Sequence, residues 1–161
     1  MISRINPLMS QKIGLFFKNP RPGFVKTRLS PPLPPGDAAA LYEAFLEDTI
    51  AACRRVTGAE LVLFDGSPGE SWEKLPSDTP VVPQSGPNLG ARMTRALEVL
   101  RDGGAREAVL VGSDIPTLPA RAIREALDLL GHQDVVLGPS GDGGFYLIGV
   151  SVPPGELLAG I

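Results

Sequence analysis

Four basic side chains follow the first apolar segment of the chain within eleven positions. Lys18, Arg21, Lys26 and Arg28 lie in the stretch KNPRPGFVKTRL (residues 18–29), which glycine and proline shape into a loop. Arginine offers a planar fork and lysine a compact point charge, so such a loop suits a polyphosphate. The loop has neither the G-x-x-x-x-G-K-[ST] pattern nor the G-x-G-x-x-G pattern. Two interpretations therefore stay open: a phosphate-binding loop, or a solvated basic loop stiffened by proline.

A single carboxylate comes directly after another apolar segment. This residue is Asp114, in the stretch VGSDIPTL (residues 111–118), where a proline fixes the turn that follows. Mg²⁺ and Mn²⁺ prefer one or two carboxylates together with substrate phosphates, so Asp114 is a candidate metal ligand. The alternative is an aspartate that serves a turn or caps a helix.

A third segment, LGPSGDGGFYLIG (residues 137–149), surrounds Asp142 with four glycines. Glycine is needed where the backbone approaches a ligand closely or adopts a positive φ. Asp142 is therefore a candidate second ligand for a metal or a hydroxyl group. The alternative is a β-hairpin turn with Asp-Gly at its tip.

A fourth segment, QSGPNLGARM (residues 84–93), places Asn88, Gly90 and Arg92 at the expected start of a helix. Backbone amides at such a position can meet a base, a ribose or a phosphate. The alternative is that Asn88 is a helix N-cap and Arg92 lies on the solvent face.

The segments that must position these residues alternate between strands and helices. Apolar runs predict strands at residues 13–17, 60–64, 79–84, 108–111, 134–137 and 145–150. Helices are expected from Asp37 as N-cap, over residues 89–101, and from Pro119. Their predicted inner faces carry Leu41, Phe45, Ile50, Cys53 and Val56 in the first helix, Leu89, Met93, Ala96, Leu97 and Leu100 in the second, and Ile123, Ala126, Leu127 and Leu130 in the third. The pattern predicts one α/β domain with a parallel sheet covered on both faces. Ligands of such sheets bind beyond the carboxyl ends of the strands.

Composition excludes several classes of function. The 161 residues carry a formal net charge of -3, so there is no basic excess for coating DNA or RNA. The apolar runs are far shorter than the roughly 20 residues of a membrane span. One cysteine and one histidine leave neither a disulfide framework nor a His/Cys zinc site. Residues 1–12 lack the apolar stretch of a secretory signal. We therefore expect a cytoplasmic protein whose metal, if any, is held by oxygen.

Four motifs in order carry a family resemblance. PRPGFVKTRL, QSGPNLGARM, GSDIPTL and GPSGDGGFYLIG resemble those of bacterial glycosyltransferase-like proteins, which include radical-SAM- and selenodomain-associated transferases. These proteins have the nucleotide-diphospho-sugar transferase fold and are distantly similar to the molybdenum-cofactor and 2-phospholactate guanylyltransferases. The resemblance implies a three-layer α/β/α sandwich with a mostly parallel, GT-A-like and Rossmann-like sheet over residues 13–161. Residues 1–12 are then expected to be a disordered N-terminal extension.

The resemblance also implies a set of site residues. The implied nucleotide-binding residues are Gly23, Lys26, Thr27, Arg28, Leu89, Gly90, Arg92 and Ser113. Asp142, Gly143, Gly144 and Phe145 would line the acceptor side. Lys26 and Asp114 would be catalytic, and Asp114 and Asp142 would hold Mg²⁺ or Mn²⁺.

The resemblance also predicts more chain than is printed here. Family members continue with a W-S-containing segment, another helix and strand, and a D-x-D-type acidic motif, whereas this sequence stops at Ile161. The implied domain is incomplete at its C-terminus, and its metal site lacks an acidic residue. A partner copy in a homo-oligomer is the expected cover for the exposed edge.

The function expected from these features is metal-dependent transfer from a nucleotide-activated donor to a small-molecule acceptor, with glycosyl transfer from a nucleotide sugar preferred. One alternative is nucleotidyl transfer that releases pyrophosphate from a nucleoside triphosphate. An alternative of another class is a non-catalytic nucleotide-binding or assembly subunit.

Overall fold

The computed structural model describes residues 10–67, 69 and 72–161. Its strands are β1 (Gln11–Phe17), β2 (Ala59–Asp65), β3 (Val81–Pro83), β4 (Glu107–Gly112), β5 (Val135–Pro139) and β6 (Phe145–Val150). Its helices are α1 (Pro35–Arg54), α2 (Leu89–Asp102) and α3 (Ala120–Leu129), with a short 3-10 helix, η1, at Thr27–Leu29. The order of strands and α-helices is the predicted one. Of the expected extension, residues 1–9 lie outside the described residues, and β1 starts two residues before Ile13.

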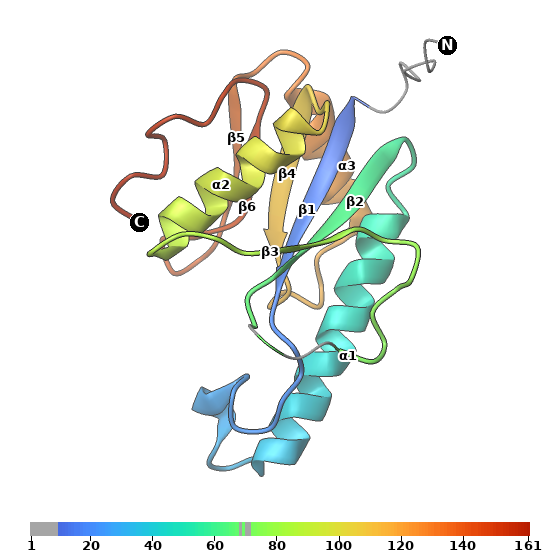
Figure 1. Cartoon of the computed structure of the whole chain (residues 1–161), viewed down its shortest axis with the longest axis vertical. Helices are drawn as coiled ribbons and strands as arrows, with labels where there is room; N and C mark the ends of the chain where they lie inside the picture. The colour runs from blue at the N-terminus through green and yellow to red at the C-terminus, as the bar shows by residue number, and fades with distance from the viewer. Residues whose placement is uncertain (1–9, 68, 70–71) are drawn as a thin grey trace.

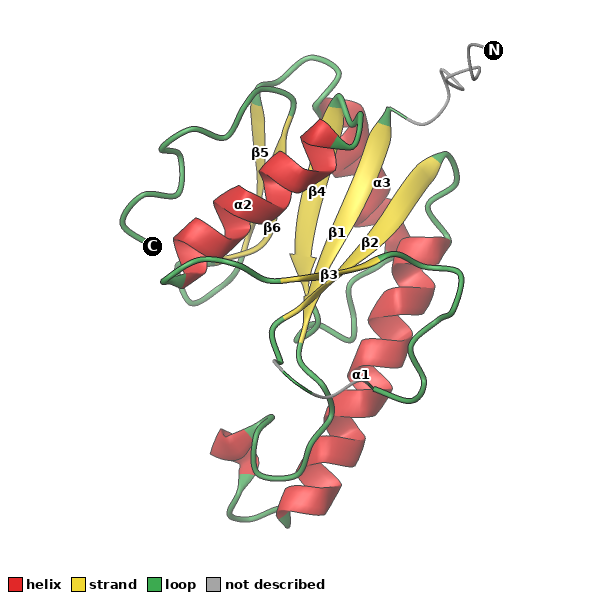
Figure 2. Cartoon of the chain, in the orientation of Figure 1, coloured by secondary structure: helices red, strands yellow, loops and turns green. Residues whose placement is uncertain are grey.

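The strands form one mixed sheet in the order β3-β2-β1-β4-β6-β5 (Figure 2). β1 pairs in parallel with β2 and with β4, and β2 pairs in parallel with β3. β6 is antiparallel to both of its neighbours. A short connection between adjacent strands makes a hairpin, and the five residues between β5 and β6 allow no parallel crossover. The mostly parallel sheet is confirmed, and β6 is its exception.

Helices cover both faces of the sheet (Figure 1). Alternating residues of β4 show the division: Val109 and Val111 pack into the core shared with α1 and α3, while Ala108 and Leu110 pack into the core shared with α2. Successive side chains of a strand point to opposite faces, so an unbroken apolar run fills both cores. The predicted three-layer sandwich is confirmed.

Two predicted inward residues are exposed instead. Leu41 is 37% and Leu89 is 54% exposed. The N-terminal part of α1 extends past the sheet (Figure 1), and Tyr42 and Leu46 take its buried face. Leu89 is the first residue of α2, where Gly90 is the buried neighbour.

The first helix also begins earlier than predicted. Pro34 is the N-cap of α1, so Asp37 lies inside the first turn, where a negative charge favours the helix dipole. The predicted inner face of α3 is buried as expected. Within the described residues, no helix is both long and apolar enough to cross a membrane.

Candidate active site

The predicted segments meet at one edge of the sheet, which we call the carboxyl rim. It is formed by the loops after β1, β2 and β4 and by the β5–β6 turn (residues 140–144). β1, β2 and β4 are parallel and therefore end at this edge. β5 is antiparallel to β6, which is antiparallel to β4, so β5 ends there too. The topology thus brings together segments that are far apart in the sequence.

At the rim, Lys26 and Asp114 form an ion pair. Lys26 Nζ lies 2.8 Å from Asp114 Oδ1, and the two side chains are 23% and 70% exposed. The ammonium also lies 5.9 Å from the centre of the Phe45 ring on α1. The structure thus brings together two residues that the resemblance assigns to one site, and the catalytic roles of both residues stay predictions.

The backbone of the basic loop is shaped at two positions. Gly23 has φ of 81°, and a Cβ there would meet nothing, so the glycine is needed for its backbone angle alone. Lys26 has a left-handed backbone with φ of 48° and ψ of 36°, directly before η1. Non-glycine residues adopt this conformation at a cost of about 1–2 kcal/mol. Thr27 and Arg28 follow in η1 and are exposed to solvent.

Sequence reasoning missed Tyr42, which links two strand ends beneath the rim. Its hydroxyl accepts a hydrogen bond from the Lys18 N–H at 3.0 Å and lies 2.8 Å from Ser113 Oγ. Ser113 is 6% exposed, so its hydroxyl is engaged inside the protein rather than presented to a ligand. A tyrosine on the buried face of a helix needs a hydrogen-bond partner for its hydroxyl. This requirement was the one sequence feature that could have indicated a role for Tyr42.

A second carboxylate, Asp65, was also missed. It is the last residue of β2, beside the end of β1, and accepts a hydrogen bond from the Ser67 N–H at 2.7 Å. Burial raises the pKa of Asp65, and the Ser67 N–H opposes that change. Burial is also the main cause of the raised pKa of Tyr42, to which the charges of Asp114 and Asp65 add. Both carboxylates therefore act electrostatically on the hydroxyl beneath the rim.

Asp142 lies at the tip of the β5–β6 hairpin. Its Oδ1 accepts hydrogen bonds from the Ser140 hydroxyl and, at 3.1 Å, from the Gly144 N–H. These bonds, the Ser140 one first, lower the pKa of Asp142. Gly143 supplies the positive φ of 88° that the turn requires, and Phe145 is half-buried at the start of β6. The hairpin interpretation is confirmed, and metal or acceptor binding here stays a prediction.

The start of α2 is occupied by the chain itself. Asn88 is the N-cap and accepts a hydrogen bond from the Ala91 N–H at 2.8 Å, as the alternative interpretation predicted. Arg92 Nε donates to the Gly86 carbonyl at 3.1 Å. The Gly90 N–H points to the Ile161 carbonyl at 3.4 Å. Nucleotide binding by Leu89, Gly90 and Arg92 is an untested prediction, and the last two already have partners in the chain.

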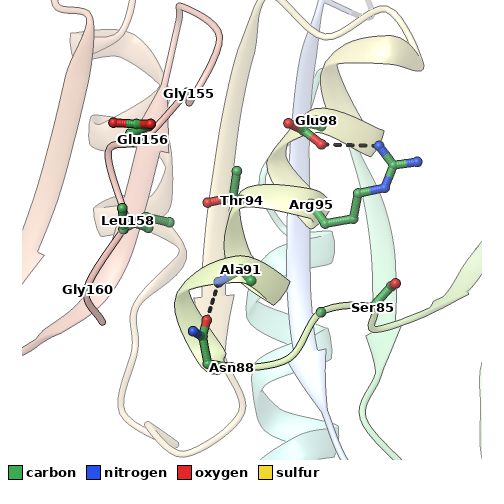
Figure 3. Close-up of a pocket in the computed structure, with 12 residues that line it drawn as sticks. Ser85, Asn88, Ala91, Thr94, Arg95, Glu98, Gly155, Glu156, Leu158 and Gly160 are labelled. Carbon is green, nitrogen blue, oxygen red and sulfur yellow. Dashed lines mark hydrogen bonds and ion pairs between the residues drawn. The ribbon is translucent and has the colours of Figure 1, made fainter.

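Beside this helix start lies a hollow of about 580 Å³, which we call the α2 pocket (Figure 3). It lies between α2 and the C-terminal segment, and Arg95 and Glu98 pair across its wall at 3.1 Å. Its lining residues are Ser85, Gly86, Asn88, Ala91, Thr94, Arg95, Glu98, Gly155, Glu156, Leu158, Ala159 and Gly160. Lys26 and Asp114 do not line it, although Ser85, Gly86 and Asn88 follow β3, which is parallel to β2 and ends at the same edge of the sheet.

The rim offers few ligands for a metal. Within residues 10–67, 69 and 72–161, no three His, Cys, Asp or Glu side chains are grouped closely enough to hold one. Asp114 does attract a cation, since the Lys26 ammonium lies on its carboxylate. Mg²⁺ typically binds to one or two carboxylates and to substrate phosphates. Asp114 therefore fits a divalent cation that arrives with a diphosphate.

Solved structures show the same fold. A candidate nucleotide-diphospho-sugar transferase from Desulfovibrio desulfuricans G20 is 36% identical, with a TM-score of 0.85 over 95% of this chain and 69% of that chain. Rv0371c from Mycobacterium tuberculosis H37Rv, in a structure with manganese, is 18% identical, with a TM-score of 0.55 over 95% of this chain and 77% of that chain. CMP:2-keto-3-deoxy-manno-octonic acid synthetase with CTP is 12% identical, with a TM-score of 0.52 over 80% of this chain and 52% of that chain.

These similarities confirm the fold predicted from the four motifs. At 18% and 12% identity, the second and third structures show the fold alone. No curated protein matches the chain. Residues 49–161 match the model of a family described as uncharacterised proteins conserved in bacteria, DUF2064. The chain, with its nucleotide-diphospho-sugar transferase-like fold, belongs to the DUF2064 family.

Proposed function

We propose that this protein is a transferase that uses a nucleotide-activated donor together with Mg²⁺ or Mn²⁺. The observation that carries the proposal is the pairing of Lys26 with Asp114 at the carboxyl rim. One cationic and one anionic group side by side match the two halves of a metal–diphosphate complex. The 36% identical neighbour, a candidate nucleotide-diphospho-sugar transferase, supports the same class of reaction.

Each rim residue has a distinct role in this proposal. Lys26 and Arg28 neutralise the charge of the diphosphate, and Gly23 and Thr27 shape the loop around it. Asp114 holds the divalent cation, which when bound neutralises phosphate charge as a Lewis acid. The β5–β6 hairpin, with Asp142, Gly143, Gly144 and Phe145, lies at the same rim and is the proposed acceptor side. Catalysis then rests on positioning and electrostatic stabilisation, without a covalent enzyme intermediate.

Glycosyl transfer is the preferred chemistry. In this reaction an acceptor attacks the sugar carbon, the bond to the diphosphate oxygen breaks, and a nucleoside diphosphate leaves. In the alternative, an acceptor phosphate attacks the α-phosphorus of a nucleoside triphosphate and pyrophosphate leaves. The similarity to a candidate nucleotide-diphospho-sugar transferase favours the first.

Thermal melting against nucleotides and nucleotide sugars, with and without Mn²⁺, tests the proposal. We expect metal-dependent stabilisation by at least one nucleotide, and its loss in Asp114→Ala. Assays for free nucleoside diphosphate and for pyrophosphate then separate the two chemistries. Absence of any nucleotide-dependent shift would contradict the proposal. Binding with no turnover of either kind would favour a non-catalytic nucleotide-binding subunit.

A further inference from the structure

The ion pair at the rim joins the two side chains that the proposed function assigns to different ligands. Lys26 would bind the diphosphate and Asp114 the divalent cation, yet Lys26 Nζ lies 2.8 Å from Asp114 Oδ1. A divalent cation at that carboxylate and the Lys26 ammonium repel each other, so they compete for the same negative charge. A diphosphate and the carboxylate compete for the ammonium in the same way. Each protein group therefore competes with the ligand of the other.

The lysine is the anchored member of this pair. Its side chain is 23% exposed, against 70% for Asp114, so the ammonium reaches the carboxylate from the protein side. Its backbone is held in the left-handed conformation, and its carbonyl accepts a hydrogen bond from the Leu29 N–H at 2.9 Å. Strained backbone of this kind persists only where the surroundings determine it. The structure thus holds the Lys26 ammonium group against the Asp114 carboxylate.

We propose that Lys26 keeps the Asp114 carboxylate occupied until a diphosphate takes up its ammonium, so that divalent cation and diphosphate bind as a pair. This inference rests on the proposed function and concerns the same site. When phosphate oxygens pair with Lys26, the Asp114 oxygens become available to the cation that those phosphates carry. Linkage requires the coupling to be reciprocal, so each ligand tightens the other by the same factor.

Titration calorimetry in metal-free buffer separates the two halves of this coupling. With Mn²⁺ alone, Lys26→Gln is expected to bind about tenfold more tightly than the wild type, because the competing ammonium is gone. With inorganic pyrophosphate alone, Asp114→Asn is expected to bind about tenfold more tightly, because Lys26 is released. An ordinary structural ion pair predicts no gain in either arm. Nucleoside diphosphates titrated beside pyrophosphate show whether the nucleoside adds affinity.

Two matched variants control for charge and for folding. Lys18→Gln removes a lysine from the same loop, and a gain in Mn²⁺ affinity as large as that of Lys26→Gln would show long-range electrostatics instead of competition. Lys26→Arg keeps a cation at the position and is expected to keep Mn²⁺ binding as weak as in the wild type. Thermal melting of each variant without ligand confirms that it is folded.

The outcomes distinguish this inference from the proposed function. If Mn²⁺ and a nucleoside diphosphate bind the wild type through Asp114, but Lys26→Gln gains nothing with Mn²⁺, the coupling is wrong and the proposed function stands. If the wild type binds no diphosphate with Mn²⁺ at millimolar concentrations, the proposed function fails, and the inference fails with it.

Discussion

The carboxyl rim and the α2 pocket differ in what they offer a ligand. The rim presents an ion pair over a buried hydroxyl network, whereas the α2 pocket is a hollow of about 580 Å³ between a helix and the C-terminal segment. The helix start beside that pocket already has partners: Asn88 caps it, and the Gly90 N–H points to Ile161. A search for concave shape alone therefore finds the α2 pocket, whereas a search for charged side chains finds the carboxyl rim. The proposed function places the diphosphate at the paired charges of the rim and not in the α2 pocket.

Matched arginine substitutions test this contrast most strongly. Arg28→Gln at the rim is expected to lower the affinity for a nucleoside diphosphate about 10–100-fold, since a hydrogen bond to a charged group contributes about 1.5–3 kcal/mol. Arg95→Gln is expected to change this affinity less than about twofold, because Arg95 lines the α2 pocket and not the rim, and the exposed ion pair that it forms with Glu98 adds little to stability. Calorimetric titration measures both. A larger loss in Arg95→Gln would move the nucleotide to the α2 pocket.

Gly90→Ala sharpens the contrast from the α2 side. A Cβ there would lie 2.3 Å from the Leu158 carbonyl oxygen, so the C-terminal segment must shift. We expect a loss of about 1–3 kcal/mol in the free energy of unfolding, as for other overpacked sites. Urea unfolding measures this loss. Gly36→Ala is the control, because a Cβ there meets nothing and α1 is helical at that position. An equal effect of both variants would contradict the packing argument.

Tyr42→Phe tests the network beneath the rim. The aromatic ring keeps its packing, but the Lys18 N–H and the Ser113 hydroxyl lose their partner. The expected loss of stability is about 1–2 kcal/mol, the penalty for buried polar groups left without a hydrogen bond. Chemical unfolding of this variant is compared with Tyr146→Phe in β6, where we expect less than half of that loss. Equal losses of stability in the two variants would mean that the hydrogen bonds of the Tyr42 hydroxyl add no stability of their own.

The smallest expected effect is a difference in pH dependence between Asp142 in the β5–β6 turn and Asp65 at the end of β2. The pKa of Asp142 is lowered by its hydrogen bonds, so its contribution is present above the unfolded value of 3.8 and is lost as pH falls through the folded pKa. The pKa of Asp65 is raised by burial, so stability falls as pH rises from 3.8 through its folded pKa.

Single amide substitutions separate these two signs. Asp142→Asn is expected to destabilise the protein at neutral pH, whereas Asp65→Asn is expected to be neutral or stabilising. Both differences from the wild type should shrink toward pH 3. Urea unfolding from pH 3 to 7 in the presence of a chelator measures them. If both variants changed the free energy of unfolding in the same direction at neutral pH, hydrogen bonding at Asp142 and burial at Asp65 would not be the causes of the two pKa shifts.

The site residues found from sequence share one property: they belong to short motifs in loops or at the ends of helices and strands next to them. Lys26 and Asp114 stand out as charged residues between apolar runs, and both lie at the rim. Tyr42 and Asp65 do not stand out in this way. Tyr42 lies within a helix and Asp65 at the end of an apolar strand, so only their spatial neighbours show what they contact. Ser113 and Gly90 were found by motif, but both contact the protein itself. The Ser113 hydroxyl lies against Tyr42, and Gly90 packs against the Leu158 backbone.

The amino-acid sequence by itself determined the order of strands and helices, the burial of the central strands on both faces and the sheet edge at which the charged loops meet. Apolar periodicity and turn residues encode the strands and helices locally. The right-handed crossovers of α/β folds then bring the ends of the parallel strands to one edge. Only the tertiary structure decided that the Lys26 ammonium lies on the Asp114 carboxylate and that the start of α2 is covered by residues 158–161. Each of these depends on contacts between segments distant in sequence, and no local pattern records them.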